Sequence, residues 1–82
     1  MQQMPQGFRR HIDLDMMDFL MNQISERIDK ASEYFMKRVA ALQRGDRWTA
    51  EFIEEMHIKM LDAQVSYLVK KLSEVLNGVK ND

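Results

Sequence analysis

The sequence predicts an all-α protein, an antiparallel two-helix hairpin that oligomerisation completes as a helical bundle. Residues that favour helix dominate the 82-residue chain, which contains only one Pro and three Gly. Two long segments repeat apolar residues at helical spacing, and one short break at residues 43–49 separates them. Helices joined by so few residues are antiparallel neighbours.

The length and composition limit how such a hairpin can be stabilised. A chain of 82 residues buries only about 60% of the surface of its unfolded state, so a single small core is marginal. The chain has no Cys, which removes disulfides, thiolate metal sites and Cys nucleophiles. We therefore expect a homo-oligomer, or binding to a helical partner protein, to supply the missing burial.

The charge pattern argues against several classes of partner. Twelve basic and 13 acidic residues are interleaved in the chain and give a net charge of -1, so no nucleic-acid partner is expected. No apolar run of about 18 residues is present, and no basic start precedes an apolar block, so neither a membrane span nor a cleaved signal peptide is predicted. The expected location is the cytoplasm, with export without a cleaved signal peptide as the alternative.

The first 11 residues are predicted to be a mobile tail, and residues 12–82 to form the hairpin, whose first helix runs from about 13 to 43. Asp13 is the expected cap of this helix, because its side chain can accept a backbone hydrogen bond at the positive end of the helix dipole. The apolar residues of this helix fall within one arc, which we expect to face the second helix. They are Leu14, Met17, Leu20, Met21, Ile24, Ile28, Ala31, Phe35, Val39 and Leu42.

The break between the helices contains residues suited to ending one helix and starting another. Gly45 can adopt the left-handed conformation of a helix end, and Asp46 and Thr49 can both cap the next helix. With Thr49 as the cap, Trp48 lies just outside the helix and is spaced to pack on Ile53 as a hydrophobic staple. The prediction is a turn at 44–49 and a second helix from about 50 to 77.

The second helix has more apolar surface than the first can cover. One predicted patch contains Phe52, Ile53, Met56, Met60, Ala63 and Tyr67, and the other contains Val65, Leu68, Val69, Leu72, Val75 and Leu76. A helix that is apolar on several sides is buried by several neighbours. We therefore predict an interface with copies of the chain or with another protein, drawn from both patches, and leave open which patch faces the partner. Its residues are Phe52, Ile53, Met56, Met60, Tyr67, Leu68, Leu72, Val75 and Leu76.

One pair of residues has the spacing of a metal half-site. Glu54 and His57 form Glu-x-x-His, which di-iron bundle proteins use twice, but the second copy is missing and symmetry across a dimer would have to supply it. The competing interpretation, which the sequence favours, is that His57 is a packed or interface residue. No catalytic triad, phosphate-binding Gly loop or buried carboxylate pair is recognisable, so we expect no enzymatic activity and no cofactor.

The layout of the chain also has a counterpart in a known family. Its first helix contains Ile28-Asp29-Lys30-Ala31, and its second contains Phe52-Ile53-Glu54-Glu55-Met56 and Ala63-Gln64-Val65-Ser66-Tyr67-Leu68. In this order of helix, turn and helix, the region from Ile24 to Asn81 resembles the inner-rod and needle subunits of type III secretion systems. The resemblance implies a C-terminal helix that packs against its copies in an assembly lining a secretion channel. The chain departs from the family at Arg44-Gly45-Asp46-Arg47-Trp48, where needle subunits usually have a Pro-flanked turn.

Three hypotheses for the function follow. The first is a non-enzymatic helical assembly subunit or interaction module, as a structural component of a bacterial secretion apparatus. The second is a small dimeric four-helix-bundle regulator or chaperone. The third is a dimeric metal–carboxylate protein that uses Glu54 and His57.

Overall fold

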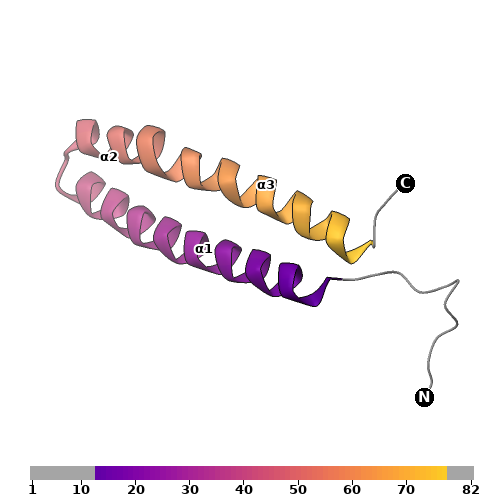
Figure 1. The fold of residues 1–82 in the computed structure, drawn as a ribbon. Helices are drawn as coiled ribbons and strands as arrows, with labels where there is room; N and C mark the ends of the chain where they lie inside the picture. The colour runs from indigo at the N-terminus through magenta and orange to yellow at the C-terminus, as the bar shows by residue number, and fades with distance from the viewer. Residues whose placement is uncertain (1–12, 78–82) are drawn as a thin grey trace, which may run out of the picture.

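The computed structural model describes residues 13–77, which form an antiparallel helical hairpin (Figure 1). The elements, in chain order, are α1 (Leu14–Gln43), α2 (Arg47–Ile53), the π-helical segment η2 (Glu54–Ile58) and α3 (Lys59–Leu76). The segments α2, η2 and α3 continue one another and together lie along α1. The predicted all-α hairpin is confirmed, and the predicted tail at residues 1–11 lies outside the described residues.

Within residues 13–77, no helix has the length and apolar character needed to cross a membrane.

Local chemistry at the two ends of α1 sets its length. At the start, the Asp13 side chain accepts a hydrogen bond from the Met16 N–H at 3.0 Å, which confirms the predicted cap. At the end, Gly45 has φ of 79°, and its N–H donates to the Leu42 carbonyl while the Asp46 N–H donates to the Ala41 carbonyl. These two bonds form a Schellman motif, which explains why Gly stands at this position.

The second helix begins earlier than predicted, because Asp46 and not Thr49 is its cap. The Asp46 carboxylate accepts a hydrogen bond from the Thr49 N–H at 3.1 Å, so the helix starts at Arg47 and not near residue 50. Trp48, expected before the helix as half of a staple with Ile53, instead lies within α2. Its ring stacks on Phe52, with ring centroids 5.4 Å apart.

The Asp46 cap predicts a specific dependence of stability on pH. Hydrogen bonds from the side chain and the backbone N–H of Thr49 lower the pKa of Asp46 below its ordinary value of 3.8. The ionised carboxylate therefore stabilises the fold above that value, and this stabilisation is lost as the pH falls through the lowered pKa. We expect the Tm to decrease on acidification below about pH 4, and to decrease less steeply in Asp46→Asn, whose amide caps helices without titrating. Thermal melts of both proteins across this range test the prediction, and identical pH profiles would contradict it.

The contact between α1 and the second helix is narrow and contains few large buried side chains. In residues 13–77 the buried apolar residues are Leu20, Ala41, Ala50 and Ile53, and two of these four are alanines. From the end of η2 along α3 the contact row is only half-buried and alternates three- and four-residue steps, as in a coiled coil. This row contains Ile58, Leu61, Val65, Leu68, Leu72 and Val75.

The π-helical segment changes the register of the second helix. The Lys59 N–H donates to the Glu54 carbonyl, five residues back, as the wider π turn requires. This extra residue allows both Ile53 and Ile58, five positions apart, to lie toward α1. In an uninterrupted α-helix, one of these two side chains would point away from α1. The two predicted patches assume such a helix, and the angle between them is therefore overestimated.

Candidate functional site

In the middle of the hairpin contact, α1 presents polar and aromatic side chains to the second helix, whose own contact row is apolar. Three cross-helix pairs involve these side chains, at α1 positions where a coiled coil usually has apolar residues. They are a hydrogen bond from Arg27 Nε to Gln64 Oε1 at 3.0 Å, a stacked pair of Tyr34 and His57 with centroids 4.2 Å apart, and an ion pair of Arg38 and Glu54 at 3.4 Å. These pairs connect the two helices at three levels of the hairpin.

The two candidate metal ligands have separate partners on α1. Glu54 pairs with Arg38, and His57 lies flat on Tyr34. His57 lies opposite Tyr34, because the two residues are equally far along the chain from the Gly45-Asp46 turn. Among residues 13–77, no group of three His, Asp or Glu side chains could hold a metal ion together. A site completed across a dimer stays a prediction.

The predicted apolar arc of α1 divides into two groups. Leu20 is buried, and Met17, Ile24, Ala31 and Val39 are half-buried. The other five residues recur at seven-residue intervals, and between 45% and 65% of each is exposed. They are Leu14, Met21, Ile28, Phe35 and Leu42, and we call this row the α1 ridge. Residues seven apart lie on nearly the same side of a helix. The prediction that these five residues pack against the second helix is therefore wrong, because polar pairs take the facing positions and displace the ridge to one side.

An open groove lies between the α1 ridge and α3. It has a volume of about 520 Å³ and is lined by Ile28, Ala31, Ser32, Phe35, Met36, Ile58, Leu61, Asp62 and Val65. Further along α3, Val69 and Leu76 follow Asp62 at seven-residue intervals and are about half exposed. We use the name ridge face for this whole side of the hairpin: the α1 ridge, the groove, Val69 and Leu76.

The other side of the hairpin, which we call the polar face, has a different character. Its groove of about 460 Å³ is lined by Arg27, Met60, Ala63, Gln64, Tyr67 and Leu68. The Arg27 guanidinium also donates to the Gln23 side chain at 2.7 Å, and the Lys71 ammonium lies 5.6 Å from the centre of the Tyr67 ring. Charged and amide groups thus interrupt the apolar surface of the polar face.

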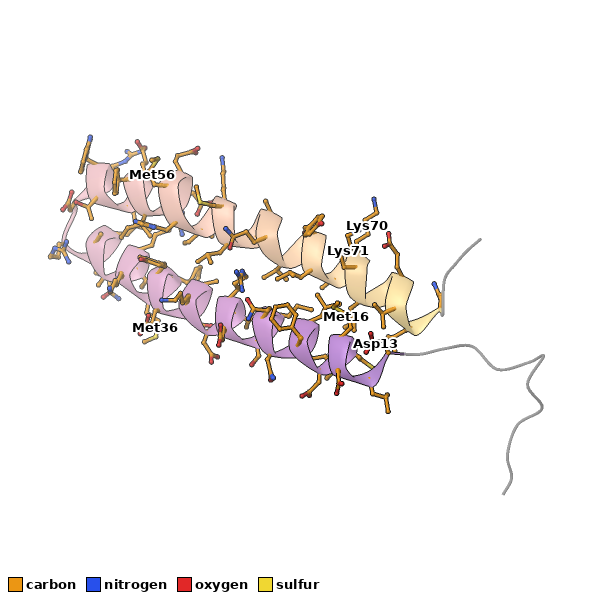
Figure 2. The ribbon with its side chains drawn as sticks, in the orientation of Figure 1. Asp13, Met16, Met36, Met56, Lys70 and Lys71 are labelled. Atoms are coloured by element: carbon orange, nitrogen blue, oxygen red, sulfur yellow. The ribbon has the colours of Figure 1, made fainter. Side chains whose placement is uncertain are left out.

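A third exposed cluster lies near the turn, on α2 and η2. Trp48, 72% exposed, and Met56, 50% exposed, line a shallow depression of about 210 Å³ together with Glu51, Phe52 and Glu55. Met36, at the edge of the groove of the ridge face, is also exposed and points away from the second helix (Figure 2). Among residues 13–77 apolar exposure is therefore widespread, and the ridge face combines it over both helices.

The structure divides the nine predicted interface residues among five places. Ile53 is buried; Leu68, Leu72 and Val75 are half-buried in the contact row; Phe52 and Met56 line the depression near the turn; Met60 and Tyr67 line the polar face; and Leu76 lies on the ridge face. Their role in binding a partner stays a prediction. The sequence interpretation missed the α1 ridge, which its strict seven-residue interval could have revealed.

The described residues thus place exposed apolar side chains of both helices together. The resemblance to type III secretion subunits stays a prediction. No model of a known protein family, no curated protein and no solved structure matches the chain.

Proposed function

We propose that this chain is a helical assembly subunit, which acts by association through exposed apolar surface and not by catalysis. One observation supports this most strongly: in the described part of the chain four apolar residues are buried, whereas 15 large apolar residues are exposed. Monomeric soluble proteins rarely expose contiguous apolar patches larger than a few hundred Å². The imbalance indicates that the single hairpin is an incomplete folding unit.

The energy of burying the α1 ridge is large enough to matter. Each of its five side chains is about half exposed, so complete burial would contribute about 1 kcal/mol per residue and about 5 kcal/mol in total. This equals the lower end of the free energy of unfolding of small domains, about 5 to 15 kcal/mol. Association through this surface would therefore change a marginal hairpin into a stable protein.

Two kinds of assembly are compatible with such a subunit. A rod or filament, as the resemblance to type III secretion subunits implies, needs a head-to-tail contact that does not close. A dimeric four-helix-bundle regulator or chaperone instead uses the same surface on both copies. The proposed function covers both, because each depends on association of the apolar surface.

The mass and the helix content of the purified chain over a range of concentrations test the proposal. We expect the mass from sedimentation to exceed the 9.8 kDa of one chain at tens of micromolar. Helix content and Tm should both decrease on dilution, because association stabilises only the folded state. A 9.8 kDa species whose helix content and Tm do not change with concentration would refute the proposal.

A further inference from the structure

We propose that a second copy of this chain covers the ridge face. The two hairpins pack face to face about a two-fold axis and close into an antiparallel four-helix bundle. This inference rests on the proposed function, because it names the partner of the same apolar surface.

The size of the ridge face matches the requirement of a stable dimer. The 30 residues of α1 extend for about 45 Å, and two adjacent helices are about 20 Å wide. The face therefore offers about 900 Å² per copy, compared with about 800 Å² per partner in a standard protein interface. A partner has to present an apolar surface two helices wide and equally long, and the ridge face of a second copy does so.

The charges of the hairpin are complementary to those of a second copy. Residues 13–28 contain four acidic and one basic residue, and residues 29–44 contain two acidic and four basic. On the second helix, each segment has the opposite sign to the α1 segment beside it. Residues 46–58 contain four acidic and one basic residue, and residues 59–77 contain two acidic and three basic. At the open end of the hairpin, Asp13 thus begins α1 where Lys70 and Lys71 approach the end of α3 (Figure 2).

This alternation of sign favours two-fold stacking. With the axis along the helices, each half of α1 covers a half of opposite charge on the second helix of the other copy. With the axis across the helices, the acidic half of α1 covers the basic half of the other α1, and the acidic α2–η2 segment covers the basic α3. If the second hairpin were stacked on the first without rotation, each segment would cover its own copy and like charges would meet. The charge pattern therefore favours the two-fold dimer.

The shapes of the ridge and groove are also complementary. The α1 ridge projects large side chains such as Ile28 and Phe35, and beside it the groove of about 520 Å³ is lined by the small Ala31 and Ser32. In a two-fold arrangement the ridge of each copy meets the groove of the other. This is the knobs-into-holes packing of helical bundles, and it would bury the ridge without rearranging the hairpin.

Single cysteines can test this arrangement, because the chain contains no native Cys. Ser32→Cys places a thiol in the groove of the ridge face, and Ala63→Cys is the matched control in the groove of the polar face. Both positions are exposed in the single hairpin. At concentrations where sedimentation gives twice the 9.8 kDa chain mass, we expect the Ser32→Cys thiol to react with maleimide at least about tenfold more slowly than the Ala63→Cys thiol. The difference should disappear when the protein is diluted to monomer.

The other outcomes separate this inference from the proposed function. Equal labelling rates in a dimer, or protection of the Ala63→Cys thiol alone, would overturn the ridge face as the interface and leave association intact. Growing oligomers or filaments would overturn the closed dimer in the same way. A monomer at every concentration would contradict the proposed function itself. If Ser32→Cys fails to fold by circular dichroism, Ser25→Cys replaces it, seven residues earlier on the same side of α1 and also exposed.

Discussion

Replacing Ile53 by Asp is expected to unfold the hairpin, whereas replacing Met56 by Asp is expected to leave it folded. Ile53 is 8% exposed and is one of two large side chains buried in the described residues, whereas Met56 is 50% exposed. Removing a buried Ile costs about 2 to 5 kcal/mol, and desolvating the new carboxylate adds several more. The sum is comparable to the whole free energy of unfolding of a small domain, about 5 to 15 kcal/mol.

Far-ultraviolet circular dichroism and urea unfolding of both variants measure this difference. Ile53→Val is the matched control, because it keeps an apolar side chain and costs about 0.5 to 1.5 kcal/mol. Its helix content should remain that of the unchanged protein. If Ile53→Asp kept the helix content and unfolding midpoint of Ile53→Val, the contact between α1 and α2 would not hold the hairpin together.

Features that depend on neighbouring residues could be predicted from the sequence. Asp13 caps α1 as expected, and Gly45 ends it in the left-handed conformation. These signals act through hydrogen bonds that span three to five residues, so local sequence determines them. The sequence offered two competent caps, Asp46 and Thr49, three positions apart. The Schellman motif, whose last donor is the Asp46 N–H, determines which of them caps the second helix.

Features that depend on the partner helix could not be predicted in the same way. Arg27 and Gln64 are 37 positions apart, and nothing in the periodicity of α1 distinguishes an Arg that faces another helix from one that faces solvent. The apolar arc of α1 was therefore assigned to the hairpin contact, although polar pairs occupy the middle of it. The π-helical segment is a second reason why the contact could not be predicted. Its one added residue rotates all later side chains about the helix axis by about 100°. The seven-residue interval of the α1 ridge is visible in the sequence, but its exposure follows from which α1 side chains face the second helix.

Replacing Phe35 by Glu is expected to weaken association by about 10⁴-fold. Phe35 is 53% exposed in the hairpin, so the single copy loses little, but in the proposed dimer the residue is buried. Each copy would lose about 1 kcal/mol of apolar burial, and desolvating the carboxylate would cost about 2 kcal/mol more. Two-fold symmetry doubles this to about 6 kcal/mol, at about 1.4 kcal/mol for each factor of ten in Kd.

Tyr67→Glu is the matched control for this variant, since Tyr67 is 59% exposed but lies on the polar face. Sedimentation equilibrium should give a Kd for Tyr67→Glu within about tenfold of that of the unchanged protein. If Tyr67→Glu were monomeric and Phe35→Glu remained a dimer, the interface would lie on the polar face and the prediction would be wrong. Loss of association in Phe35→Glu alone would locate it on the ridge face, because the two residues have similar exposure and the substitutions introduce the same charge. The side of the hairpin on which that charge lies would then be the cause of the difference.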